Sequence, residues 1–217
     1  IVHCNDWQTG LIPVYLKDID SFAKDPFYHG IKSIMTIHNL KFQGVWDKQT
    51  IKDMTGLSDY FFTPDKLEYY KDANLLKGGL VYANKITTVS ETYAQEITTG
   101  EYGEGLDGLL SARRGDLRGI VNGISEDWDP KTDTFIYKNY TARSLKQKAV
   151  NKTELQKELN LPVDENKFMI GVISRLTDQK GFDLVAYAME RLCEGGLQLV
   201  DEKGACNKGN PKAEGVA

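Results

Sequence analysis

Residues 168–185, FMIGVISRLTDQKGFDLV, decide the fold of this chain. The stretch begins with a continuous apolar run at 168–173, which is typical of a strand buried on both faces. A polar loop with Arg175 and Lys180 follows, and apolar residues then recur at helical spacing from Phe182 to Leu192. In a parallel sheet such a loop lies beside the unpaired N–H groups of a helix N-terminus, where a pyrophosphate can bind. Taken alone, the loop favours two solvated cations over an anion site.

The composition is that of a globular protein with a hydrophobic core. The chain has 217 residues, of which 41% are hydrophobic, and its formal net charge of -4 gives no argument for binding nucleic acid or an anionic membrane. No apolar run approaches the roughly 20 residues of a membrane span. Cys4, Cys193 and Cys206 lack the spacing of metal ligands. We therefore predict a cytoplasmic protein without a metal site and without nucleic-acid or membrane partners.

The rest of the chain repeats the alternation of strand and helix. Further strands are predicted at 1–3, 34–37, 85–89, 117–124 and 197–200, and further helices at 11–16, 74–83, 91–98 and 141–159. This alternation predicts parallel sheets of the α/β class. We interpret residues 47–72 as a loop with short helical pieces, and residues 201–217 as loop or disorder.

The glycines at 103, 105 and 108 form a G-x-G-x-x-G pattern. A helical segment precedes them, whereas a dinucleotide-binding fingerprint requires a strand in front of the first glycine. We therefore interpret this segment as a mobile loop and not as a phosphate site.

Polar side chains follow several of the predicted strands. They are Asp6 and Trp7, His38, Asn122, and the two cations Arg175 and Lys180. Each has a structural alternative: a helix cap for Asp6, a core residue for Trp7, a structural histidine for His38, and a tight turn with positive φ at Asn122–Gly123. Because the carboxyl ends of parallel strands meet at one edge of a sheet, their shared position predicts an active site.

Several motifs carry a resemblance to a known family. They are HCNDWQTGLIPVYL (3–16), TIHNLKFQG (36–44), ITTVSETYAQEI (86–97) followed by YGEGLDGLL (102–110), and IVNGISEDWDPKTD (120–133) leading to GVISRLTDQKG (171–181). In this order, and from residue 1 to about 200, the chain resembles bacterial and plant glycogen/starch synthases. The resemblance implies a two-domain GT-B fold with Rossmann-like parallel sheets. It also implies retaining transfer of glucose from ADP-glucose to the non-reducing end of an α-1,4-glucan, with no metal or other cofactor.

The resemblance also implies roles for the residues that bind the sugar donor. Arg175 and Lys180 match the basic pair that binds the donor diphosphate and stabilises the departing ADP, since fixed cations favour the charge that builds there. His38 matches the histidine beside the donor glucose, and Asn122 matches the asparagine that hydrogen-bonds this glucose.

On the acceptor side, Asp6 and Trp7 match the pair that lines the entry of the glucan 4-hydroxyl. Many members of the family have histidine at the positions of Asn5 and Gln8, so a proton-transfer role for those histidines does not carry over to this chain.

The family's pattern implies that the chain is an internal fragment. The lysine- and glycine-rich donor loop would lie upstream of residue 1, and the acidic motif would lie beyond the end. We expect 1–117 to be the later part of the acceptor-side domain, 118–200 to begin the nucleotide-sugar domain, and 201–217 to depart from the family. Such a fragment is expected to be inactive alone.

The residues are also compatible with three other classes of protein. The first is another retaining GT-B transferase, such as a sucrose synthase-like or UDP-sugar enzyme, because the nucleobase pocket would lie mostly beyond residue 200. The second is a nicotinamide-dependent dehydrogenase, which the misplaced glycines disfavour. The third is a non-catalytic glucan-binding module, which aromatic residues on the surface would favour.

Overall fold

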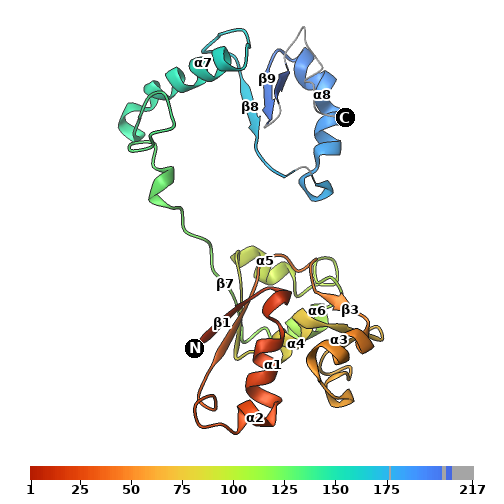
Figure 1. Ribbon diagram of the computed structural model, residues 1–217. Helices are drawn as coiled ribbons and strands as arrows, with labels where there is room; N and C mark the ends of the chain where they lie inside the picture. Colours follow the sequence, from red (N-terminus) through yellow and green to blue (C-terminus); the bar gives the residue numbers. More distant parts are fainter. Residues whose placement is uncertain (176, 202–203, 207–217) are drawn as a thin grey trace. The chain divides into compact units, whose positions relative to one another are not determined.

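The computed structural model describes residues 1–175, 177–201 and 204–206 (Figure 1). The chain divides into two compact units, residues 1–123 and residues 124–217. The division falls beyond the domain change expected near Leu117, because β7 (Leu117–Gly119) completes the sheet of the first unit by pairing with β6 (Lys85–Thr88). That these units correspond to acceptor and nucleotide domains stays a prediction.

The first unit is built on a parallel sheet of the predicted kind. Its strand order is β1 (Val2–Asn5), β2 (Ser33–Ile37), β6 and β7, and every neighbouring pair is parallel. In register across it lie Cys4, Met35, Ile86 and Leu117, all of which are buried. This row of apolar side chains forms the sheet's contribution to the core, which explains why these strands have to be apolar on that face.

Helix α4 (Leu75–Tyr82) separates two hydrophobic clusters of the first unit. Its Leu76 and Leu80 pack with the sheet, whereas Leu75 packs in a second cluster with Phe61 and Phe62. The other helices of this unit are α1 (Leu11–Asp18), α2 (Asp20–Ala23), α3 (Lys48–Thr55), α5 (Glu91–Glu96) and α6 (Asp107–Ala112). Burial on two sides makes α4 hydrophobic around most of its surface.

Helix starts in the first unit follow the expected capping chemistry. Ser90 caps α5 as predicted, since its hydroxyl accepts a hydrogen bond from the backbone N–H of Tyr93 at 3.2 Å. The Asn74 side chain caps α4 by accepting from the Lys77 N–H at 2.8 Å. These bonds satisfy N–H groups that the helix itself leaves unpaired.

Residues 47–72 are only partly the loop that the sequence predicts. Helical pieces are present as α3 and a 3-10 turn at Asp59–Phe61, but β4 (Glu68–Tyr69) also pairs with β5 (Asp72–Asn74), which pairs in turn with β3 (Val45–Trp46). All of this small sheet is antiparallel. The turn between β4 and β5 has positive φ at Tyr70 (50°) and Lys71 (78°). Such φ values favour Asn and Gly, so Tyr-Lys gives no turn signal in the sequence.

The second unit contains the strand, loop and helix predicted from residues 168–185, but the expected burial of the strand on both faces is wrong, since Phe168 and Ile173 are exposed. Strand β8 (Met169–Val172) leads through a 3-10 turn at Asp178–Lys180 into α8 (Phe182–Glu194), and β9 (Gln198–Asp201) pairs with β8 in parallel. The predicted helix at 141–159 is divided into a 3-10 segment, Ala142–Gln147, and α7 (Lys148–Glu158), with non-helical φ and ψ at Ser144. A further 3-10 turn covers Glu126–Trp128.

The prediction of an irregular tail from Asp201 is wrong for part of that segment. Residues Gly204–Cys206 form β10, which pairs antiparallel with β9. Three residues are too few to show an alternating pattern, and the free edge of β9 supplies the hydrogen-bonding partners that favour a strand there. Residues 202–203 and 207–217 lie outside the described residues.

A buried polar pair joins α7 to the second sheet. The side-chain amide of Gln156 donates to Gln198 Oε1 at 2.7 Å, and the Gln198 amide donates to the carbonyl of Pro162 at 2.8 Å. Both glutamine side chains are fully buried, and these hydrogen bonds offset the cost of removing them from water. In the part of the chain that the structure describes, no helix is long and apolar enough to cross a membrane.

Candidate functional site

The carboxyl ends of β1 and β2 are tied together by Asp6. Its backbone N–H donates to the Thr36 carbonyl at 2.9 Å, and its Oδ1 accepts from the backbone N–H of His38 at 2.8 Å. Asp6 has a positive φ of 53° and no capping bond to the 3-10 turn Trp7–Thr9 that follows. The carboxylate therefore joins two strand ends, and the alternative interpretation of Asp6 as a helix cap is wrong.

The side chain of His38 lies in the same cluster. Its Nε2 is 2.9 Å from Oδ1 of Asn5, the last residue of β1, and the ring is exposed. The structure thus brings Asp6 and His38 together, as their strand-end positions predict. It adds Asn5, which sequence reasoning noted only as a departure from the family. We call Asn5, Asp6 and His38 the strand-end cluster.

The half-buried side chain of Trp7 lies between the hydrophobic core and an open pocket. Its indole packs against both hydrophobic clusters of the first unit, so the core interpretation of this residue is partly right. Gly44, with φ of 62°, lies against the ring, and a Cβ there would come within 2.4 Å of Trp7 Cε3. Only glycine meets both conditions, the left-handed backbone and the close approach of the indole.

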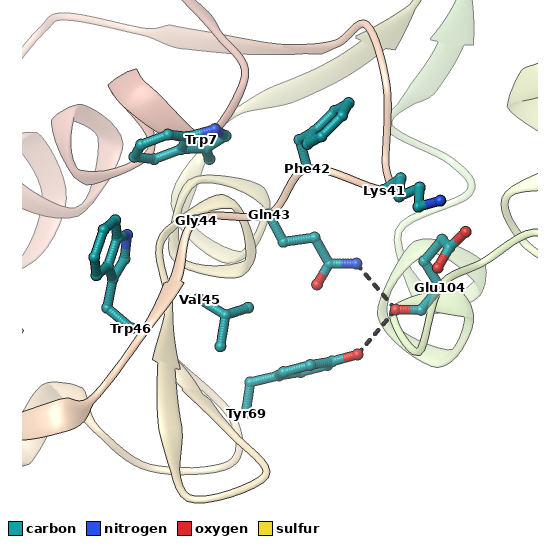
Figure 2. A pocket seen from close by; sticks show the side chains of 9 residues that line it. All are labelled: Trp7, Lys41, Phe42, Gln43, Gly44, Val45, Trp46, Tyr69 and Glu104. Atoms are coloured by element: carbon teal, nitrogen blue, oxygen red, sulfur yellow. Dashed lines mark hydrogen bonds between the residues drawn. The ribbon is translucent and has the colours of Figure 1, made fainter. Parts of the chain in front are cut away.

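The pocket beside Trp7 has a volume of about 460 Å³ and lies within the first unit (Figure 2). It is lined by Trp7, Lys41, Phe42, Gln43, Gly44, Val45, Trp46, Tyr69 and Glu104. Aromatic rings pack on the C–H faces of a sugar, while a carboxylate, an amide and an ammonium group can hydrogen-bond to its hydroxyls. Both the size and the lining suit a polyhydroxylated ligand.

One wall of this pocket is the glycine segment that the sequence predicts to be mobile. The Glu104 carbonyl accepts hydrogen bonds from the Gln43 side-chain amide and from the Tyr69 hydroxyl, each at 2.9 Å, and Figure 2 shows both bonds. Gln43 is held in turn by the Asn74 amide, which donates to its Oε1 at 2.5 Å. The segment is therefore anchored to the β3–β5 region by a hydrogen-bonded chain that the sequence pattern does not reveal.

The backbone of that wall has two residues in the left-handed region, Glu104 with φ of 48° and Gly105 with φ of 76°. A Cβ on Gly105 would come within 2.3 Å of the Tyr69 hydroxyl. Burial raises the pKa of Tyr69, and the nearby hydroxyl and carboxylates of Tyr70, Glu104 and Asp107 raise it further. Tyr69 therefore keeps its proton and remains a hydrogen-bond donor at neutral pH.

Asn122 follows β7 by three residues, because this strand ends at Gly119 and not at residue 124 as predicted, and Asn122 does not lie in a tight turn. Neither Asn122 nor Gly123 has a positive φ, so the prediction of that turn geometry is wrong. The backbone continues past β7 with Ile120 N–H still donating to the Thr88 carbonyl at 2.8 Å, so the chain does not reverse there. Within the described part of the chain, the exposed Asn122 side chain makes no hydrogen bond.

Arg175 and Lys180 lie in the second unit, between β8 and α8. Both are exposed, and Gly181 directly after Lys180 has a φ of 68° before the helix begins at Phe182. Neither cation forms an ion pair or a side-chain hydrogen bond with the described residues. The predicted position beside a helix N-terminus is present, and the binding role of these cations stays a prediction.

The comparisons with known proteins agree with the motifs. A sequence profile described as the starch synthase catalytic domain matches residues 1–112. A glycogen synthase from Lachnospira eligens is 63% identical over 202 residues, which are 92% of this chain and 42% of that protein. The chain belongs to the glycogen/starch synthase family. A second glycogen synthase of this family, from Thermotoga maritima, is 50% identical over 201 residues, 92% of this chain and 41% of that protein.

A solved structure of the same family confirms the predicted GT-B class of α/β fold. The catalytic domain of starch synthase IV from Arabidopsis thaliana, bound to ADP and acarbose, matches with a TM-score of 0.80 and 33% identity. The match covers 92% of this chain and 41% of that one. The chain thus spans about two fifths of the length of the family members that it matches.

Proposed function

We propose that this protein transfers glucose from ADP-glucose to the non-reducing end of an α-1,4-glucan with retention, as a glycogen or starch synthase. The observation that carries the proposal is the strand-end cluster beside an aromatic pocket, in a chain that belongs to this family. In this reaction the bond between the glucose C1 and the diphosphate breaks. The acceptor 4-hydroxyl forms the new bond to C1 and gives up its proton, and ADP leaves with the electron pair of the old bond.

Arg175 and Lys180 are assigned to the leaving group: they bind the diphosphate of the departing ADP. Negative charge builds on the diphosphate as the bond to C1 breaks, and two fixed cations lower the free energy of that state more than that of bound ADP-glucose. Two observations support this assignment. Both cations lie between the carboxyl end of β8 and the 13-residue helix α8, and no carboxylate among the described residues pairs with either of them.

The donor glucose is assigned to His38 and Asn122. His38 is held at both its backbone N–H and its ring, so it can present a defined hydrogen-bonding edge to a sugar. Asn122 offers an amide that can both donate and accept. Asp6 orients His38 through the 2.8 Å bond to its backbone. We assign Asp6, together with Trp7, to the acceptor side because of their match to the family's pair.

The acceptor glucan is assigned to the pocket of Figure 2. Trp7, Trp46 and Tyr69 provide rings for stacking, and Gln43 and Glu104 provide polar groups for hydroxyls. The Arabidopsis starch synthase was solved with acarbose as well as ADP, which supports a saccharide site in this family.

We propose that the reaction needs no metal or other cofactor, because Arg175 and Lys180 neutralise the charge of the diphosphate. We also propose a cytoplasmic location, which the odd number of cysteines and the free, buried thiol of Cys4 support.

Labelled glucose transfer tests the proposal. The enzyme that contains this chain is incubated with glycogen and either ADP-[¹⁴C]glucose or UDP-[¹⁴C]glucose, and precipitated label is counted. We expect incorporation from the ADP sugar, with unlabelled ADP competing better than UDP. Incorporation only from the UDP sugar would move the protein to the UDP-sugar-dependent retaining GT-B transferases.

A glucan-binding module without catalysis is the second candidate, and the aromatic pocket favours it. Retention on a glycogen column without any binding of ADP or ADP-glucose, in the same enzyme, would support this module and contradict the transferase.

A further inference from the structure

The ring of His38 has a hydrogen-bonding partner whose chemistry selects one tautomer. Nε2 of His38 lies 2.9 Å from Oδ1 of Asn5. An amide oxygen can only accept, so the imidazole nitrogen that faces it has to carry the hydrogen. A neutral histidine with its hydrogen on Nε2 has a free electron pair on Nδ1.

Asn5 and His38 are both held in place at the backbone. Asn5 ends β1 and pairs in register with Thr36 of β2, and its carbonyl accepts from the Thr9 hydroxyl at 2.9 Å. The backbone N–H of His38 donates to Asp6 Oδ1 at 2.8 Å. The bond between the two side chains therefore joins two fixed strand ends and costs less conformational entropy than one between free loops.

The other ring nitrogen of His38 is available to a ligand. The ring is exposed, and its Nδ1 makes no hydrogen bond with the described residues. Because the free pair on Nδ1 is an acceptor, it matches the hydroxyl of a sugar, which can donate to it. If Nδ1 carried the hydrogen, it would donate to the hydroxyl oxygen and could not accept a hydrogen bond from the hydroxyl.

We propose that Asn5 is a positioning residue that holds His38 in the Nε2–H tautomer, so that Nδ1 accepts a hydrogen bond from a hydroxyl of the bound sugar. The second half of this proposal rests on the proposed function, because it needs a sugar beside His38. The first half concerns the chain alone.

The other two of the chain's three histidines serve as internal comparisons for the tautomer of His38. Nδ1 of His29 lies 3.2 Å from the Ala23 carbonyl, which only accepts, so the opposite tautomer is expected there. Nε2 of His3 lies 2.6 Å from the Thr36 hydroxyl, which can donate or accept and therefore selects neither tautomer by itself.

Long-range ¹H–¹⁵N correlation spectra of the ¹⁵N-labelled chain test the tautomer. At about pH 8.5, where histidine is ordinarily neutral, we expect His38 to show an unprotonated Nδ1 and His29 an unprotonated Nε2. Asn5→Leu removes the acceptor at similar volume and should give His38 averaged nitrogen shifts. Asn5→Asp keeps an oxygen acceptor and should keep the tautomer.

The control is Gln8→Leu, which removes a neighbouring exposed amide that makes no side-chain hydrogen bond with the described residues. It should leave the His38 shifts unchanged. Averaged shifts for His38 in the unaltered chain, or unaltered shifts in Asn5→Leu, would overturn the proposal.

Steady-state kinetics test the effect on the sugar. In the enzyme that contains this chain, Asn5→Leu should lower kcat/KM for ADP-glucose about tenfold, since the loss of one oriented hydrogen bond costs that order of free energy. An unchanged kcat/KM would overturn the positioning role even if the tautomer is as expected. Absence of transfer by the unaltered enzyme would contradict the proposed function, and the tautomer would still be decided by the spectra.

Discussion

The two groups of candidate site residues differ in how the fold holds them. In the first unit, His38 is held at two points: its backbone N–H donates to Asp6 Oδ1 at 2.8 Å, and its ring Nε2 lies 2.9 Å from Asn5 Oδ1. In the second unit, Arg175 and Lys180 are exposed and have no side-chain partner among the described residues. The first group is positioned before any ligand arrives, whereas a ligand would itself supply the partners of the second.

This difference has an energetic consequence. A substitution in the strand-end cluster removes bonds that also stabilise the fold, so stability and activity should fall together. A substitution of an exposed cation removes little from the folded state, so activity should fall alone.

Removing either cation should separate activity from stability most clearly. In the enzyme that contains this chain, Arg175→Ala and Lys180→Ala should each lower turnover by roughly 10²-fold or more, as losses of charge stabilisation do. The thermal unfolding midpoint should remain unchanged. Lys146→Ala, which removes another exposed cation of the second unit, is the control and should alter neither quantity. Normal elongation of glucan by both variants would show that the diphosphate is bound elsewhere.

Gly44→Ala should reduce the stability of the first unit. The new Cβ would overlap the Trp7 ring at 2.4 Å and would stand on a backbone with φ of 62°. We expect a loss of about 2 kcal/mol in the free energy of unfolding, measured by urea denaturation, because overpacking and left-handed strain add.

The matched control for that change is Gly108→Ala in α6, where a Cβ meets nothing within 4 Å. It should raise the free energy of unfolding by up to about 1 kcal/mol, the helix preference of alanine over glycine. Equal effects of the two substitutions would mean that the contact between Gly44 and Trp7 does not constrain the site.

Asp6→Ala should destabilise the chain by about 1.5 kcal/mol in the same measurement. It removes the acceptor of the His38 N–H and leaves alanine on a backbone with φ of 53°. Asp6→Asn keeps an oxygen acceptor and a residue that tolerates positive φ, so it should restore most of the loss. An Asn variant as unstable as the Ala variant would show that the negative charge matters more than the bond.

The smallest effect concerns a tyrosine of the first unit that lies outside the site. The Tyr82 hydroxyl donates to Asp18 Oδ2 at 2.6 Å and joins the ends of α4 and α1. Burial raises the pKa of Tyr82, and the hydrogen bond to the negative Asp18 raises it further. The folded state therefore retains this proton at a pH where the unfolded chain loses it.

The resulting stabilisation should be complete below about pH 10, the ordinary pKa of tyrosine, and should decline as the pH rises above it. Tyr82→Phe should lower the free energy of unfolding by about 1 kcal/mol at neutral pH and should reduce its alkaline decline. Tyr187→Phe, at an exposed position of α8, serves as the control in the same pH series. An alkaline decline of the same size in the Tyr82→Phe variant would contradict this account.

Much of the fold could be predicted because parallel strands have a strong local signal. The runs around Met35 and Ile170 are rich in apolar residues and the run around Ile86 is rich in β-branched ones, and both kinds of residue favour a strand in a parallel sheet. The small antiparallel sheet could not be predicted, because β3 and β4 have two residues each and their turn at Tyr70–Lys71 lacks turn residues. The strand at Gly204–Cys206 is hidden for the same reason of length.

The candidate site also has features that the sequence predicts and features that it does not. The sequence by itself determined which residues follow strand ends, among them Asp6, His38 and Lys180, because strand and helix periodicity depend on neighbours along the chain. Only the tertiary structure decided that Asn5 faces the His38 ring and that Glu104 closes the pocket beside Trp7. Those contacts join residues 33 or more positions apart, whose distance depends on strand register and on the packing of side chains, and no local pattern of residues encodes either.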